Sequence, residues 1–184
     1  MVRVLERPSK RQRQAGITLI EVLIGLVLIV IAGLLAVPSF TEYLERQRLK
    51  AVAESLAASL NLARSEALAQ QQFMYVQLAG QGSERWCYAV SKEAKCDCFS
   101  NACEALQRGD SAKQPGVKLS SASRTTFRFN WKNGSATGAN GTATFIGKKT
   151  GQQLCVVLSN LGRVRIITSK TKPVSGYPQD ATCR

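Results

Sequence analysis

The spacing of the hydrophobic positions changes twice along the chain. Residues 17–37 form a nearly continuous apolar run that is interrupted by Thr18 and Glu21. From residue 40 to about residue 72 apolar residues recur at steps of three and four, and beyond residue 72 they alternate with polar residues. The first two patterns favour helix and the third favours strands. The chain is therefore predicted to be an α+β protein with one long N-terminal helix packed on a C-terminal antiparallel β-sheet domain.

Residues 40–72 are predicted to form one amphipathic helix. The segment is rich in Ala, Leu, Glu and Arg and contains neither Gly nor Pro. Pro38 stands just before it, where a missing N–H weakens a helix. One apolar stripe is expected to pack against the sheet. This stripe consists of Leu49, Val52, Ala53, Leu56, Leu60, Ala63, Ala67 and Leu68.

Seven segments beyond residue 72 have the alternation and the β-branched and aromatic content of strands. Residues 79–82 and 132–134 are predicted hairpin turns, because they are rich in Gly and Asn. The predicted strands are 73–78, 85–91, 117–121, 125–131, 142–147, 153–159 and 163–168.

The N-terminal run is predicted to cross a membrane. Residues 17–37 would reach about 30 Å as a helix, which is the thickness of the hydrocarbon core. Residues 1–16 carry five basic residues and one acidic residue, so they are expected to stay in the cytoplasm while the rest is exported. A cleaved secretory signal and a plain signal anchor are the alternatives. The first lacks a small-x-small cleavage site, since Pro38 and Ser39 follow the run directly.

Glu21 is an acidic residue within the apolar run, where a carboxylate costs about 2.5–3.5 kcal/mol on insertion. The string from Gly16 to Glu21 resembles the processing site of type IV prepilins and pseudopilins, with Ile17 in place of the usual Phe. The resemblance implies that a prepilin peptidase cuts between Gly16 and Ile17 and methylates the new amine of Ile17. It also implies that Glu21 pairs with the N-terminus of a neighbouring subunit during filament assembly.

These patterns divide the chain into four predicted parts. They are a leader peptide (1–16), a membrane and polymerisation helix (17–39), an amphipathic continuation of that helix (40–72) and a β-rich domain with disulfides (73–184).

All six cysteines follow the apolar run, and an exported domain is expected to oxidise them to disulfides. Cys155 and Cys183 are predicted to pair, because that bond ties the C-terminal tail to the last hairpin. The pairing of the other four stays open, since the sequence does not choose among the connectivities. A tetrahedral zinc site is the alternative for these four. They are Cys87, Cys96, Cys98 and Cys103.

The chain contains no histidine. This removes the usual general base, the commonest metal ligand and every nucleophile paired with histidine. The sequence also shows no converging pair of acids and no Gly-rich phosphate loop. The protein is therefore predicted not to be an enzyme and to use neither a cofactor nor a metal.

The net charge is +13, and residues 105–184 hold thirteen basic residues against two acidic ones. Such a segment attracts polyanions. Arg163 and Arg165 stand two apart on a predicted strand, so both are expected on one face. No acidic residue falls between Asp110 and Asp180, and the sequence therefore predicts nothing nearby to neutralise the surrounding positive charge.

This basic patch is expected to contact phosphates without reading bases. A solvated strand edge that discourages aggregation is the simpler alternative. The predicted patch comprises Arg163, Arg165, Lys170, Lys172, Lys148 and Lys149.

The prepilin start, the helix ending in LNLARSEALAQQQ and the segment Gly162-Arg163-Val164-Arg165 together resemble the FimT/GspH family of minor pilins and pseudopilins. FimT-like members are implicated in DNA uptake during natural transformation, and their Gly-Arg-x-Arg segment binds DNA. The resemblance therefore implies a type IV minor pilin that binds double-stranded DNA through Gly162, Arg163 and Arg165. H-type pseudopilins of type II secretion share the fold. The alternative is therefore a structural minor pilin or pseudopilin that primes filament assembly without DNA.

The resemblance also implies protein partners and compartments for the chain. The chain would first sit in the bacterial inner membrane with its C-terminal domain in the periplasm, and would meet the prepilin peptidase there. It would then join other pilin subunits in a filament at the cell surface.

Overall fold

The computed structural model describes residues 16–100 and 103–183, without the side chains of residues 34–38. The predicted leader, apart from Gly16, lies outside the described residues. The chain divides between Ser39 and Phe40 into two compact units. One helix, α1 (Leu19–Gln70), contributes to both units and is continuous through Pro38.

In the first unit α1 begins after Thr18, whose carbonyl and hydroxyl oxygens accept hydrogen bonds from the Glu21 N–H at 3.1 and 3.3 Å. Thr18 is therefore the N-cap of the helix. The large apolar side chains from Ile17 to Ile31 are 49 to 85% exposed. A search of the described residues finds no helix with enough length and hydropathy to cross a bilayer. The membrane-spanning segment 17–39 stays a prediction.

In the second unit α1 packs on the β-strands through the predicted stripe. Its members from Leu49 to Ala67 are at most 2% exposed. Leu68 departs from the prediction with 43% exposure, because it lies at the margin of the stripe in the last turn of the helix. The helix ends at Gln70, two residues earlier than expected, and Gln71 adopts a φ of 52°.

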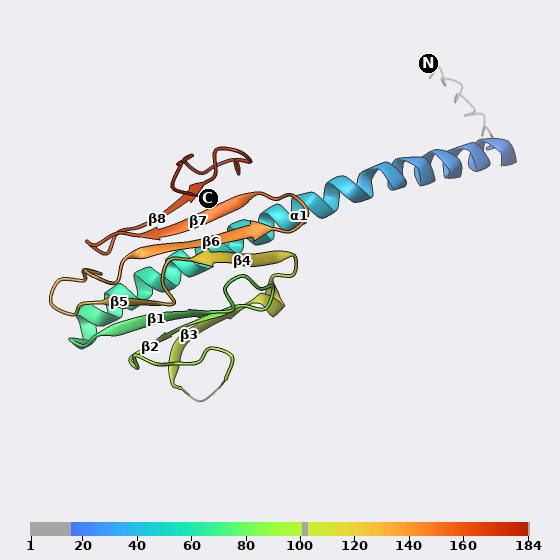
Figure 1. Ribbon diagram of the computed structural model, residues 1–184. Coiled ribbons are helices and arrows are strands. Elements are labelled where there is room, and N and C mark those ends of the chain that lie inside the picture. Colours follow the sequence, from blue (N-terminus) through green and yellow to red (C-terminus); the bar gives the residue numbers. More distant parts are fainter. Residues whose placement is uncertain (1–15, 101–102, 184) are drawn as a thin grey trace, which may run out of the picture. The chain divides into compact units, whose positions relative to one another are not determined.

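The strands form two antiparallel four-stranded sheets on one side of the second half of α1 (Figure 1). The prediction of a long helix on antiparallel β-structure is confirmed, although one sheet was expected. The first, sheet A, has the order β3 (Ala105–Asp110), β2 (Cys87–Ser91), β1 (Met74–Ala79) and β5 (Thr126–Phe129). The second, sheet B, has the order β4 (Val117–Ala122), β6 (Gly141–Gly147), β7 (Gln153–Leu158) and β8 (Val164–Thr168). A short 3-10 helix, η1 (Ser111–Lys113), precedes β4.

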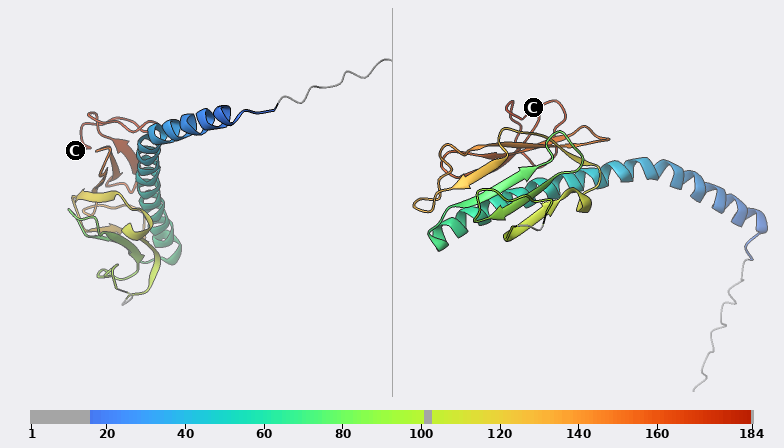
Figure 2. Two further views of the ribbon diagram at one scale, coloured as in Figure 1. Left: turned by 90° about the vertical axis from the view of Figure 1, so that its right-hand side faces the viewer. Right: turned by 60° about the horizontal axis from the view of Figure 1, so that its bottom comes forward.

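The core lies between α1 and the inner faces of both sheets, as the views in Figure 2 show. At its centre the Trp86 ring meets Phe145 edge-on with a centroid distance of 5.2 Å, and the indole N–H donates to the Val117 carbonyl at 2.9 Å. Every buried hydrophobic residue of the described chain belongs to the second unit. Residues 40–184 therefore contain the whole core.

Two local predictions were wrong or incomplete. β3 was not predicted, because its sequence ALQRGD is polar and its side chains are half-buried or exposed. Gly109 of β3 lies flat against the Tyr88 ring, and a Cβ there would lie 2.3 Å from it. Residues 132–134 do not form a hairpin turn, since the strands that flank them, β5 and β6, belong to different sheets.

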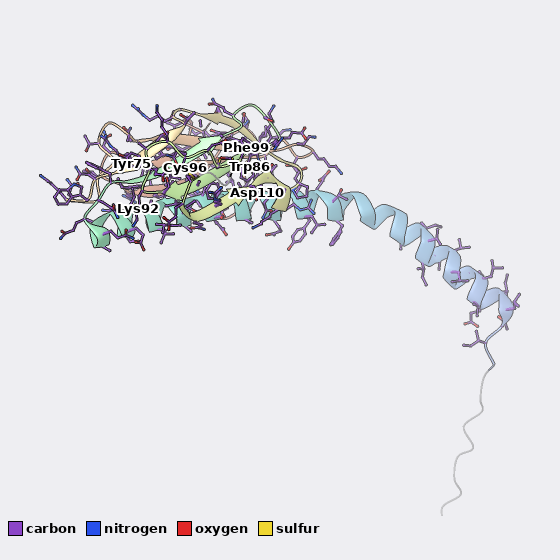
Figure 3. The ribbon with its side chains drawn as sticks, turned by 90° about the horizontal axis from the view of Figure 1, so that it is seen from below. Tyr75, Trp86, Lys92, Cys96, Phe99 and Asp110 are labelled. Atoms are coloured by element: carbon purple, nitrogen blue, oxygen red, sulfur yellow. A yellow bond between two sulfur atoms is a disulfide. The ribbon has the colours of Figure 1, made fainter. Side chains whose placement is uncertain are left out.

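All six cysteines are paired. Cys155 is joined to Cys183, the pair expected from the sequence, and the other bonds are Cys87–Cys98 and Cys96–Cys103. Cys87–Cys98 ties the segment between β2 and β3 to β2, and Cys96–Cys103 closes a loop within that segment, near the labelled Cys96 in Figure 3. The four cysteines of the alternative zinc site are therefore oxidised in disulfides.

Candidate nucleic-acid interface

The hairpin between β7 and β8 depends on Gly162. This residue has a φ of 76°, and a Cβ at its position would lie 2.1 Å from the carbonyl oxygen of Gly134. The Arg64 guanidinium of α1 donates to the Gly162 carbonyl at 3.3 Å. Gly162 is therefore needed for the close approach of two backbones. These contacts also fix the backbone from which Arg163 and Arg165 extend.

Arg163 and Arg165 lie on the outer face at the edge of sheet B. Arg165 is opposite Val157 in the pairing of β7 with β8. Both arginine side chains are exposed, whereas Val164 and Ile166 pack against the core. The strand alternation thus presents both guanidinium groups to solvent.

The lysines of the predicted patch lie at the other end of β8. Lys170 and Lys172 follow Thr168, and the Lys172 ammonium donates to the Thr150 carbonyl in the turn between β6 and β7 at 3.3 Å. That turn also holds Lys148 and Lys149. Arg163 instead follows the opposite end of β7, about 20 Å away along six extended residues. The structure therefore divides the predicted patch into an arginine group and a lysine group.

Carboxylates neutralise part of the lysine group, contrary to the expectation from sequence spacing. Lys148 forms an ion pair with Glu84. Asp180 returns to β8 through the parallel bridge between Thr168 and Gln179, and it interacts with Arg165 and Lys170. No carboxylate among the described residues lies within ion-pair distance of Arg163. Arg163 therefore has no ion pair within the described chain, whereas Arg165 and Lys170 both interact with Asp180.

Asp180 stays ionised at any pH suited to binding studies. Hydrogen bonds from the backbone N–H and hydroxyl of Thr182, both 2.9 Å long, together with the charges of Arg165 and Lys170, lower the pKa of its carboxyl below the usual 3.8. The negative charge is lost only as the pH falls through this lowered value. Acidification to about pH 5 therefore leaves it in place.

Replacing Asp180 with Asn is expected to strengthen the binding of any polyanion at Arg165. We expect an affinity for duplex DNA about two- to threefold higher at low salt, and a difference that disappears near 1 M salt, where charges are screened within about 3 Å. Fluorescence anisotropy of a labelled duplex measures it. Glu104→Gln, which removes an exposed negative charge just before β3, is the matched control. An equal gain in both variants would mean that only net charge matters.

A buried acidic residue, Glu45, holds the turn between β6 and β7 that carries Lys148 and Lys149. Glu45 of α1 is 4% exposed, and its carboxylate accepts from the Lys149 and Thr150 N–H groups at 2.9 to 3.1 Å and from the Thr150 hydroxyl at 3.0 Å. Gly116 and Gly147 leave room for it, since a Cβ on either would lie 3.3 Å or less from a carboxylate oxygen. The turn is thus anchored by its backbone, and the lysine side chains stay outside.

Several residues near the hairpin were missed by the sequence analysis. Lys132 lies over the Trp131 ring and Arg128 over the Phe73 ring, at 5.2 and 5.3 Å from the ring centroids. Together with Arg64 they place aromatic and basic side chains close to the hairpin. The alternation of apolar and basic residues in TTFRFNWK was available as a signal, but it was interpreted only as a strand.

The residues of the predicted processing site lie at the start of the first unit. Gly16 and Ile17 precede α1 and are exposed. Glu21 lies in the first turn of α1 and is also exposed. Thr18 and Glu21 have the spacing of a capping box, so Glu21 also favours the start of this helix.

A long N-terminal helix packed on antiparallel sheets is a pilin-like fold, and the comparisons identify the family. The model of the prokaryotic N-terminal methylation motif matches residues 11–37. The model of the type II transport protein GspH matches residues 52–162, more than half of the chain. The chain belongs to the GspH family of minor pilins and pseudopilins.

Two crystal structures of one minor pilin share this fold. The type IV minor pilin FimU of Pseudomonas aeruginosa matches with a TM-score of 0.52 and 23% identity over 75% of this chain and 98% of FimU. A second crystal form of FimU gives 0.50 over 72% of this chain. The minor pseudopilin EpsH of the type 2 secretion system of Vibrio cholerae gives 0.48, with 16% identity over 66% of this chain and 97% of EpsH. No curated protein matches the sequence.

Proposed function

We propose that this protein is a minor pilin that binds double-stranded DNA through Arg163 and Arg165 and assists DNA uptake in natural transformation. The observation that supports the proposal is the pair of exposed guanidinium groups at the edge of sheet B, where no carboxylate of the described residues lies within ion-pair distance of Arg163. Arginine forms bidentate contacts with phosphate. Lys170 and Lys172 would add contacts farther along a duplex, and Lys148 and Lys149 would add weaker ones.

The same proposal includes the maturation of the chain. A prepilin peptidase would cut between Gly16 and Ile17 and methylate Ile17, within the segment that matches the methylation motif. Residues 17–39 would hold the protein in the inner membrane before assembly, with the C-terminal domain in the periplasm. In the filament the exposed apolar residues of α1 would pack against other subunits, and Glu21 would pair with the amine of a neighbour.

The test compares duplex binding by the full chain in uncharged detergent with that of the variant Arg163→Gln/Arg165→Gln. We expect the affinity to fall about tenfold or more. The slope of log K against log salt should become smaller by roughly 0.9 for each phosphate that the variant no longer binds. Lys92→Gln/Lys95→Gln removes the same charge from an exposed segment after β2 and is the control. Equal reductions of affinity in both variants, or no duplex binding at low salt, would contradict the proposal.

The match to the GspH model favours a second candidate function. In this alternative the protein is a structural minor pilin or an H-type pseudopilin of type II secretion that primes filament assembly. It would then bind other subunits and no DNA. Charge-removing variants of β8 would leave filament assembly unchanged and reveal no DNA-dependent phenotype.

A further inference from the structure

An aromatic and basic surface lies at the end of the domain where α1 and β5 end, and the proposed duplex contact does not use it. We call this surface the end wall and define it by Phe73, Arg128, Trp131, Lys132 and Leu161. Met74 pairs with Phe129 in sheet A, so Phe73 before β1 and Trp131 after β5 lie at the same end of that sheet. Leu161 lies at the tip of the β7–β8 hairpin and is 79% exposed.

The end wall and the hairpin are joined by backbone contacts. The Asn130 N–H donates to the Ser135 carbonyl at 2.8 Å, which closes the loop after β5. The Ala136 N–H then donates to the Asn160 carbonyl at 2.9 Å, which fastens this loop to the hairpin. The close approach of Gly134 and Gly162 completes the junction. Because the loop and the hairpin are fastened together, Trp131 and Arg163 belong to one continuous surface.

The charges of the end wall are open to a ligand. Arg128 and Lys132 are exposed and lie over the rings of Phe73 and Trp131. Among the described residues, neither cation forms an ion pair with a carboxylate. A cation above an aromatic ring is attracted by the ring and keeps N–H donors for an anion.

A cation–aromatic pair elsewhere in the domain has a different setting. Arg85 lies over Phe99 at 5.2 Å, at the other end of sheet A from Tyr75 (Figure 3). There, however, the Asp97 carboxylate accepts from the Phe99 N–H at 3.0 Å. That pair therefore has a negative charge beside it, whereas no carboxylate of the described residues forms an ion pair with Arg128 or Lys132.

We infer that the end wall stacks unpaired bases of single-stranded DNA, such as the overhanging end of a duplex held by Arg163 and Arg165. The inference rests on the proposed function and extends it from phosphate contacts to base contacts. The exposed Phe73 ring and the half-buried Trp131 ring each lie beneath an exposed cation. This arrangement suits a ligand with flat bases joined by phosphates, and such stacking does not depend on base sequence. A protein neighbour is the competing occupant of the same surface.

Tryptophan fluorescence of the full chain in uncharged detergent tests the inference. The chain has two tryptophans, and Trp86 is 2% exposed and hydrogen-bonded in the core. We expect oligothymidylate of about 20 nucleotides to quench the Trp131 signal. Trp131→Leu is expected to lower the affinity for this oligonucleotide about tenfold and to change duplex affinity less than about threefold. Trp131→Phe keeps a ring and should restore single-strand binding.

The control variant is Phe99→Leu, which removes the other ring under an arginine and should leave both affinities unchanged. Duplex binding without quenching by oligothymidylate would overturn the inference and leave the end wall to a protein neighbour. Equal reductions of single-strand and duplex affinity in Trp131→Leu would also overturn it. A chain that binds and is quenched by oligothymidylate but does not bind duplex would overturn the proposed function and support the stacking site.

Discussion

Gly162→Ala is expected to destabilise the protein by about 2–4 kcal/mol. Two penalties add at this position. A non-glycine residue in the left-handed region costs about 1–2 kcal/mol, and the new Cβ would lie 2.1 Å from the Gly134 carbonyl oxygen. Since that oxygen belongs to a backbone, the hairpin itself must move. Urea unfolding of residues 40–184, followed through the buried Trp86, measures the loss of stability.

Gly138→Ala is the matched control for this prediction. Gly138 has a φ of 71°, and no heavy atom lies within 4 Å of the position where its Cβ would be. It therefore has the conformational penalty without the clash, and we expect a destabilisation of about 1 kcal/mol. Equal effects at the two positions would show that the contact with Gly134 contributes nothing. A larger effect at Gly162, together with weaker duplex binding, would show that the contact positions Arg163.

Glu45→Ala is expected to cost about 3 kcal/mol. The substitution leaves the N–H groups of Lys149 and Thr150 and the Thr150 hydroxyl without their acceptor in a part-buried place. Each buried donor without a partner costs about 1–3 kcal/mol, and water that enters the vacated space recovers part of this free energy. The midpoint of urea unfolding should fall accordingly, with the slope unchanged.

The neighbouring Glu42 provides the control, since it is exposed one turn earlier on the same helix. The Arg46 guanidinium, which is four residues from Glu42, donates to the Gln152 side chain at 3.0 Å. Glu42→Ala should therefore change the stability by less than about 0.5 kcal/mol. If Glu45→Ala is equally mild, the carboxylate does not hold the turn.

The helix and most strands could be predicted because their burial has a simple period. Leu49 to Ala67 recur at helical spacing, and the structure buries them together. β3 could not be predicted, because an edge strand with half-buried polar side chains has no hydrophobic period. The loop at 132–134 contains the residues of a tight turn. The packing of two sheets on α1 decides whether the flanking strands pair with each other. A local sequence pattern gives no information about this packing.

The residues of the candidate site could also be predicted only where local strand geometry determines their position. Arg163 and Arg165 were placed on one face correctly, because two residues on one strand share a fixed geometry. Lys148 and Lys149 are predicted to extend the patch from the preceding turn, yet the length of β7 separates that turn from the hairpin. Asp180 is fifteen residues after Arg165 in the sequence, and it lies beside that arginine because the tail returns to β8.

The tail covers only part of the edge of β8, and the uncovered part affects whether copies of the protein associate. The returning tail forms backbone hydrogen bonds with β8 at Thr168, through the Pro178 carbonyl and the Asp180 N–H. No strand of the described chain pairs with β8 on that side, because β8 is the last strand of sheet B. An uncovered edge invites a strand from another molecule, and charged side chains oppose such pairing. The charges of Arg163 and Arg165 are therefore also expected to oppose self-association through this edge strand. Variants that replace them should retain polar side chains of similar length, such as glutamine, so that weaker DNA binding is not confused with aggregation.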